Sequence, residues 1–183
     1  MTSPEGTSWQ SLVRARMREE IDEWVAEGRN EAQSDRPLVL LDVMGVVSDA
    51  TPVPDDGEES SDRGETQDDF LAIPSYMPAL VRHLTDVADV QWSTPLDDDL
   101  NAKLSACLGV DPLPCIEADE YGMTEPGARE LLWKAASARR ATYRIENVSS
   151  EMPSRLPDST VLINIAPDKV LRPDHLPAEL QPA

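Results

Sequence analysis

Residues 38–49 read LVLLDVMGVVSD, and this segment predicts the architecture of the chain. Its first four residues are aliphatic, and a short apolar run without polar alternation is typical of a central parallel strand covered on both faces. Asp42 follows the run directly, and Gly45 marks the turn where the chain leaves the strand. Ligands of parallel sheets bind beyond the carboxyl ends of the strands, so Asp42 is the first candidate functional residue.

Strands and helices alternate along the rest of the chain. Apolar periodicity predicts further strands at 89–92, 142–148 and 160–165, and helices at 75–88, 96–108 and 125–140. Pro78 fits only the first turn of its helix, and Gly109 fits a C-terminal cap. This alternation predicts an α/β fold, specifically a Rossmann-like three-layer sandwich around a mostly parallel sheet.

An amphipathic helix is expected over residues 8–28, followed by a polar linker. Its apolar stripe comprises Trp9, Leu12, Val13, Met17, Ile21, Trp24 and Val25. The stripe either packs on the chain's own domain or docks on a protein partner or a second copy of the chain. We therefore divide the chain into residues 1–35, the helix and linker, and residues 36–183, the α/β domain.

Residues 50–69 differ from their surroundings, because they are rich in Asp, Glu, Ser, Gly and Pro. Such a composition has little to bury and predicts a mobile acidic loop within the α/β domain. The segment is too short and too polar to form a full cap domain over the sheet edge.

Composition narrows the partners and the compartment. The chain has 35 acidic and 16 basic residues, a net charge of −19 that disfavours binding to nucleic-acid phosphates. No stretch approaches the ~20 apolar residues needed to span a membrane, and the N-terminus has no signal-peptide pattern. We therefore expect a cytoplasmic protein without a membrane segment. Cys107 and Cys115 lie among apolar residues and are expected to be buried thiols.

Polar residues follow the other predicted strands, as Asp42 follows the first. Thr94 comes after the strand at 89–92, and Glu146 and Asn147 come at the end of the next. Lys134 could join them from a helix. Carboxylates of this kind can hold Mg²⁺ together with phosphate oxygens, and an aspartate can accept a phosphoryl group covalently.

Four segments together resemble the haloacid-dehalogenase-like (HAD) superfamily. LVLLDVMGVV resembles its first motif, an apolar strand followed by Asp-x-Asp-Gly-Val. VQWSTPLDDDLNAKLSACLGVDPLP is similar to the second-motif segment of an actinobacterial subgroup that includes the HAD domain of RNA-repair proteins. LLWKAASARRATYRIENV resembles the third and fourth motifs, and NIAPDKVLRPDHL resembles the closing segment. The resemblance extends from about Leu38 to Leu176.

The resemblance implies roles for these residues. Asp42 would be the nucleophile, Thr94 would bind the transferring phosphoryl group, and Lys134 would steady the negative charges. The implied Mg²⁺ ligands are Asp42, the main-chain carbonyl of Met44, Glu146 and Asn147. Each side chain also has an ordinary structural explanation: a turn cap for Asp42, a helix cap for Thr94, a solvated helix position for Lys134 and a surface position for Glu146.

The motifs are nevertheless partly degenerate. Met44 stands where the family has a second aspartate, a general acid–base that typically contributes ~10²–10⁴-fold to turnover. Glu146 is one methylene longer than aspartate, Asn147 lacks a charge, and Pro95 has no N–H to offer a phosphate. We therefore expect a degenerate HAD-like domain with weak or no phosphohydrolase activity, which binds a protein partner or a phosphorylated ligand.

The alternative is an active Mg²⁺-dependent HAD phosphohydrolase or phosphotransferase with Asp42 as nucleophile and an aspartyl-phosphate intermediate. In that case another acid, Asp49 or one from residues 50–69, would replace the missing general acid–base.

Overall fold

The computed structural model describes residues 9–30, 34–48, 72–120, 122–147, 156–167 and 169–182. The helices are α1 (Trp9–Asn30), α2 (Met77–Val87), α3 (Asp98–Leu108) and α4 (Glu125–Ser137), and the strands are β1 (Leu38–Leu41), β2 (Asp89–Trp92), β3 (Thr142–Asn147) and β4 (Thr160–Ile165). Two 3-10 turns follow, η2 (Pro173–His175) and η3 (Ala178–Leu180). The expected order of strands and helices is confirmed. The acidic segment 50–69 and Asp49 lie outside the described residues.

The four strands form one parallel sheet in the order β2-β1-β3-β4. Leu38 pairs with Asp89 on one side and with Thr142 on the other, and all four residues of β1 are buried. The predicted central parallel strand is therefore confirmed. Because β2 lies on one side of β1 and β3 on the other, the carboxyl ends of β1 and β3 form a topological switch point, where α/β folds bind ligands.

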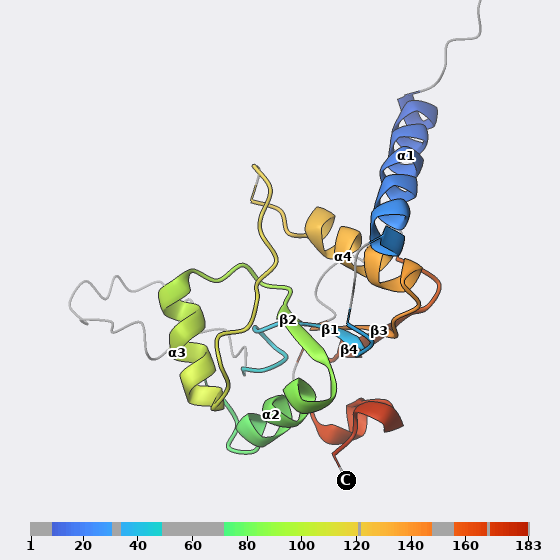
Figure 1. Ribbon diagram of the computed structural model, residues 1–183. Helices are drawn as coiled ribbons and strands as arrows, with labels where there is room; N and C mark the ends of the chain where they lie inside the picture. Colours follow the sequence, from blue (N-terminus) through green and yellow to red (C-terminus); the bar gives the residue numbers. More distant parts are fainter. Residues whose placement is uncertain are drawn as a thin grey trace, which may run out of the picture.

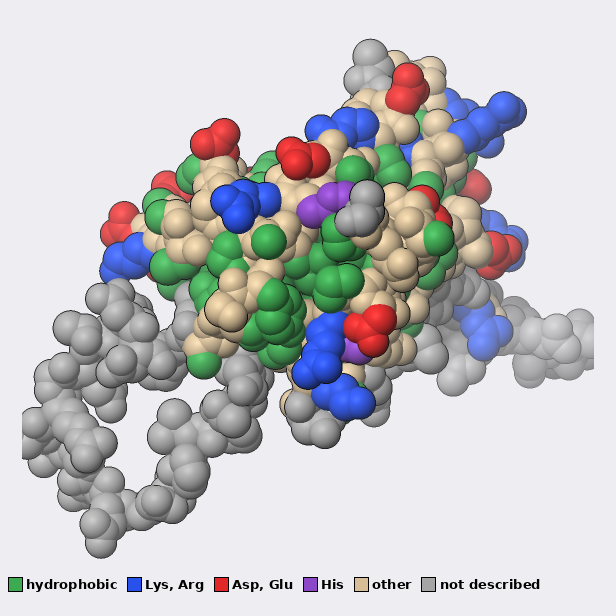
Figure 2. Space-filling view, turned by 90° about the horizontal axis from the view of Figure 1, so that it is seen from below, with side chains coloured by type: hydrophobic (Ala, Val, Ile, Leu, Met, Phe, Trp, Pro, Cys, Tyr) green, Lys and Arg blue, Asp and Glu red, His purple; other side chains and the backbone are tan. Residues whose placement is uncertain are grey.

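Helices cover both faces of the sheet, which gives the α/β sandwich that the sequence predicts (Figure 1). Residues of α2, α3 and the C-terminal turns pack on one face, and residues of α4 pack on the other. Figure 2 shows the molecule from below, where acidic and basic side chains are interspersed among apolar ones over the described residues. The negative net charge therefore does not appear as a continuous acidic patch on this part of the surface.

Local signals explain most of the helix boundaries. Pro78 occupies the first turn of α2, as predicted. α3 begins at Asp98 because the Asp97 carboxylate accepts a hydrogen bond of 2.7 Å from the Leu100 N–H, and it ends at Gly109, whose φ is 69°. α4 ends earlier than predicted, at Ser137, because Arg139 adopts a φ of 61° and turns the chain toward β3.

Only the C-terminal half of α1 packs on the domain. Gly28 lies so close to α4 that a side chain there would overlap the main chain of Lys134 and the Ser137 hydroxyl. An ion pair of 2.7 Å between Lys134 Nζ and Glu27 Oε2 joins the same two helices. Trp9, Leu12 and Val13, in the first turns of α1, are exposed. The stripe residues Ile21, Trp24 and Val25, in the half of α1 that contacts α4, are partly buried.

The two cysteines differ from each other. Cys107 is exposed, so the prediction of a buried thiol is wrong for it. Leu104 and Leu108 occupy the inward face of α3, which leaves Cys107 on the outward face. Cys115 is partly buried, and this burial raises the pKa of its thiol.

Among the described helices, none is long and apolar enough to cross a lipid bilayer.

Tyr143 makes the stability of the domain sensitive to alkaline pH. The side chain is buried in β3, and its hydroxyl donates a hydrogen bond of 2.6 Å to Glu179 Oε1. Burial, reinforced by Glu179, raises the pKa of Tyr143 from 10.0 to about 12. The folded state therefore favours the neutral phenol, and the resulting stability is present below pH 10 and is lost as the pH rises toward 12.

We expect the free energy of unfolding to fall by about 2 kcal/mol through this group over that interval. Urea unfolding at a series of pH values measures the effect. The Tyr143→Phe variant supplies the reference, because the other titrating groups are common to both proteins. A wild type whose alkaline profile has the same slope as that of the variant would contradict the prediction.

Candidate functional site

The first part of the site lies at the ends of β1 and β2. The Thr94 hydroxyl donates a hydrogen bond to Asp42 Oδ1, and the Val43 N–H donates to the same oxygen at 2.8 Å. Main-chain hydrogen bonds of 3.0 Å from the Asp42 N–H to the Ile145 carbonyl and from the Ser93 N–H to the Leu41 carbonyl extend the sheet to this point. The structure thus brings Asp42 and Thr94 together. Because Asp97 caps α3, the helix-cap explanation of Thr94 is wrong.

The second part of the site is a buried arginine between two glutamates. Arg144 Nε lies 2.8 Å from Glu146 Oε2, and Arg144 Nη2 lies 2.9 Å from Glu125 Oε2, in the first turn of α4. The side chains of Arg144 and Glu146 are only 11% and 8% exposed. Residues two apart on a strand share a face, so both project from the same side of β3. The interpretation of Glu146 as a surface acid is therefore wrong.

Opposing effects act on the Glu146 carboxyl group. Burial is the largest of them and raises the pKa of Glu146 above its usual value, while Arg144 lowers it. The negative charges of Glu125 and Asp42 raise it further. Asp42 is therefore close enough to Glu146 for its charge to act on that carboxyl group. Among the described residues, Arg144 Nε and Nη1 and Glu125 Oε1 belong to the buried polar atoms without a well-aligned hydrogen bond, so the contact between Arg144 Nε and Glu146 is an ion pair.

Met44 lies in the loop that follows β1, and Asn147 contacts this loop from the end of β3. Asn147 Nδ2 donates a hydrogen bond of 3.3 Å to the Gly45 carbonyl. Gly45 has a φ of 72°, and a side chain there would collide with the Asn147 amide, so the position requires glycine. Met44 is exposed, and its sulfur lies 3.7 Å from the Ser48 hydroxyl. A thioether at this position offers no proton to a leaving group.

Lys134 does not lie at the strand ends beside Asp42. Only residues 138–141 separate α4 from the start of β3, so the C-terminal end of α4 lies at the edge of the sheet opposite Asp42. Lys134 is nine residues, or about 13 Å of helix rise, beyond Glu125. Its ammonium group pairs with Glu27 at 2.7 Å and Glu130 at 2.8 Å, and these pairs raise its pKa. The placement of Lys134 beside the Asp42 carboxylate is therefore corrected: it joins α1 to α4.

The residues present do not fit the Mg²⁺ ion that the resemblance implies. Mg²⁺ requires oxygen ligands in near-octahedral geometry. The Glu146 carboxylate is instead paired with a guanidinium group, and Asn147 directs its amide nitrogen toward Gly45. Over the described parts of the chain, no three His, Cys, Asp or Glu side chains are grouped closely enough to hold a metal ion.

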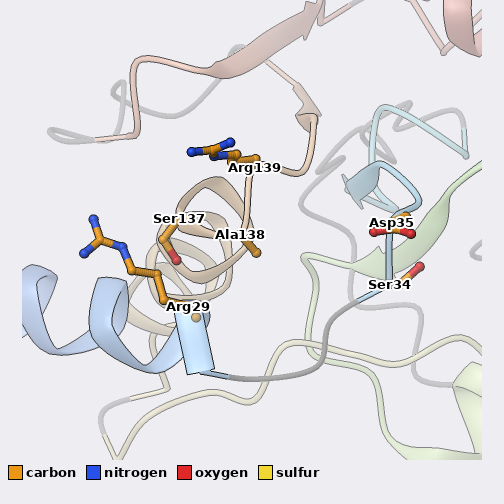
Figure 3. A pocket seen from close by; sticks show the side chains of 7 residues that line it. Arg29, Ser34, Asp35, Ser137, Ala138 and Arg139 are labelled. Atoms are coloured by element: carbon orange, nitrogen blue, oxygen red, sulfur yellow. The ribbon is translucent and has the colours of Figure 1, made fainter.

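A cavity of about 280 Å³ lies between the C-terminal ends of α1 and α4 (Figure 3). Its lining includes Arg29, Ser34, Asp35, Ser137 and Arg139, and both arginines are exposed. Because the end of α4 lies at the sheet edge opposite Asp42, the cavity is separate from the site at the strand ends.

Sequence reasoning missed Arg144 and Glu125. Arg144 lies in a strand whose neighbours are aliphatic or aromatic, and a basic residue inside such a strand requires a buried partner. Glu146, two residues further on the same face, is one such partner and could have been found from the sequence. Glu125 could not, because it reaches the site only through the packing of α4 on the sheet.

Comparison of the chain with models of known protein families, with curated proteins and with solved structures gave no match.

Proposed function

We propose that this chain is a degenerate HAD-like domain that acts by binding a protein partner and has weak or no phosphohydrolase activity. The observation that carries this proposal is the Arg144 guanidinium, which lies 2.8 Å from the carboxylate of Glu146. By the resemblance, Glu146 stands where the family places a metal-binding acid. An arginine side chain thus supplies the positive charge that a bound cation would supply in a HAD phosphohydrolase.

Two further features support binding rather than turnover. Met44 replaces the general acid–base, and such a group typically contributes ~10²–10⁴-fold to rate. Lys134, the cation that the resemblance assigns to the phosphate, pairs with Glu27 and Glu130 instead.

The charges around Asp42 favour a protein partner over a phosphorylated ligand. The negative charge of Asp42 acts on the Glu146 carboxyl group, and the Arg144 guanidinium is paired with Glu125 and Glu146. A phosphate group approaching Asp42 would meet negative charge, which raises the energy of the bound state.

The Asp42–Thr94 hydrogen bond favours the second candidate, an active Mg²⁺-dependent phosphohydrolase with an Asp42 nucleophile. The bond places the Asp42 carboxylate, a possible phosphoryl acceptor, beside the hydroxyl that the resemblance assigns to the transferring phosphoryl group. The acids that could replace the missing proton donor, Asp49 and those of residues 50–69, lie outside the described residues.

A phosphatase assay with a panel of phosphate monoesters and millimolar Mg²⁺ separates the two candidates. We expect the wild type and Asp42→Asn to give the same background rate. We also expect Met44→Asp alone to add no turnover, because Arg144 still pairs with Glu146. Circular dichroism and thermal unfolding show whether each variant is folded.

Turnover that disappears in Asp42→Asn would establish the active phosphohydrolase and refute the proposal. Turnover gained by Met44→Asp alone would show that the Arg144–Glu146 pair is no obstacle to the chemistry.

A further inference from the structure

The first half of α1 stands clear of the rest of the described chain (Figure 1). Gly28 and Glu27, near the other end of the helix, contact α4. Trp9, by contrast, is 77% exposed, and Leu12 and Val13 beside it are also exposed. An apolar patch of this kind on a protruding helix indicates a surface that another molecule covers.

The charges of α1 are separated by sign along its length. Residues 9–18 contain three basic residues and no acidic one, namely Arg14, Arg16 and Arg18. Residues 19–28 contain five acidic residues and no basic one, namely Glu19, Glu20, Asp22, Glu23 and Glu27. The helix therefore has a positive first half and a negative second half.

This arrangement destabilises the helix on its own. The helix dipole favours acidic residues near the N-terminus, but the first turn of α1 has none, and Arg29 in the last turn is its favourably placed basic residue. Arg14 and Arg18 lie four residues apart and repel each other, as do Glu19 and Glu23. The ion pair of 3.2 Å between Arg16 and Glu20 is exposed and has the less favourable order, with the basic residue first.

A second copy of the helix in antiparallel orientation would compensate for both features. Each basic half would lie along the acidic half of the other helix, and the exposed Trp9, Leu12 and Val13 of each chain would pack against its partner. A parallel arrangement would instead place arginine beside arginine. Antiparallel pairing of identical helices also satisfies the two-fold symmetry of a closed dimer.

We propose that two copies of this chain associate through α1 in antiparallel orientation, with residues 9–18 of each helix on residues 19–28 of the other. The inference uses α1 alone, so it goes beyond the proposed function and stands whether or not the Asp42 site turns over phosphate.

The mass of the full-length chain in solution, measured by sedimentation equilibrium at tens of micromolar, tests the proposal. We expect the wild type to have twice the 20.2 kDa mass of one chain. The triple variant Arg14→Glu, Arg16→Glu and Arg18→Glu leaves residues 9–28 with acidic charges alone and is expected to be monomeric.

A second variant reverses the sign of both halves by adding Glu19→Arg, Glu20→Arg, Asp22→Arg and Glu23→Arg to the triple variant. It keeps Glu27, which pairs with Lys134. In antiparallel orientation its halves are again complementary, so we expect it to form dimers with itself and none with the wild type. The control Val161→Ser changes an exposed apolar residue on β4 and is expected to leave the dimer intact.

Three results would overturn the proposal: a wild-type mass of one chain, a triple variant that remains dimeric, or mixed dimers between the swapped variant and the wild type. Mixed dimers would indicate parallel pairing. Circular dichroism identifies any variant whose altered mass arises from unfolding, and in that case Leu12→Ser with Val13→Ser replaces it and is expected to abolish the dimer.

Discussion

Arg144→Met is expected to lower the free energy of unfolding by about 3–5 kcal/mol, the usual cost of removing one partner of a buried ion pair. The substitution keeps most of the side-chain volume but removes the charge between Glu125 and Glu146. Glu146 would then be a buried carboxylate without its cation. Urea unfolding followed by circular dichroism measures the loss.

Arg140→Met is a matched control. Arg140 is 12% exposed, close to the 11% of Arg144, but its partner Asp89 is 36% exposed and therefore remains partly hydrated. We expect a smaller loss there, because a pair with a hydrated partner is closer to the roughly 0–1 kcal/mol of a surface ion pair. Adding Glu146→Gln to Arg144→Met should recover part of the stability, since the unpaired charge is gone. An Arg144→Met loss no larger than that of Arg140→Met would contradict the role given to this pair.

Millimolar Mg²⁺ is expected to raise the unfolding temperature of Arg144→Met and to leave that of the wild type unchanged. Without the guanidinium, the Glu146 carboxylate is available to a cation near Asp42. A ligand that binds only the folded state stabilises it by about 2.7 kcal/mol at 100 times its Kd. Thermal unfolding with and without Mg²⁺ measures the shift.

The double variant Arg144→Met with Glu146→Gln tests whether the cation acts at that carboxylate, because the response to Mg²⁺ should then disappear. Equal Mg²⁺ shifts in the wild type and Arg144→Met would show that Arg144 does not exclude a cation from Glu146.

The fold followed from local signals in the sequence. The four aliphatic residues of β1 predicted a strand buried on both faces, and Gly109 predicted the end of α3. The predicted helix boundaries were wrong at the start of α3, where two local signals competed, and at the end of α4, where the signal was unusual. Asp97 caps α3 although the predicted helix began at residue 96, and α4 ends at a left-handed Arg139, a conformation that favours glycine.

The candidate site was predictable only in part. Strand ends identified Asp42, Thr94 and Glu146, because parallel strands end at the same edge of a sheet. The predicted position of Lys134 beside Asp42 was wrong, because the prediction took no account of the direction in which α4 runs. Only eleven residues lie between Lys134 and Glu146, too few for a helix lysine to return to the edge where β3 ends. The contact of Glu125 with Arg144 depends on tertiary packing and has no local signal.

The loop after β1 is anchored from two directions. Asn147 holds Gly45 from the end of β3, and the Leu171 N–H donates a hydrogen bond of 2.8 Å to the Val46 carbonyl from the C-terminal segment. Tyr76 in turn donates to the Leu171 carbonyl at 3.1 Å. In the folded protein these hydrogen bonds fix the conformation of the main chain beside Asp42. A molecule that contacts residues 43–48 would find their hydrogen-bonding groups already in place, so little conformational entropy would be lost on association.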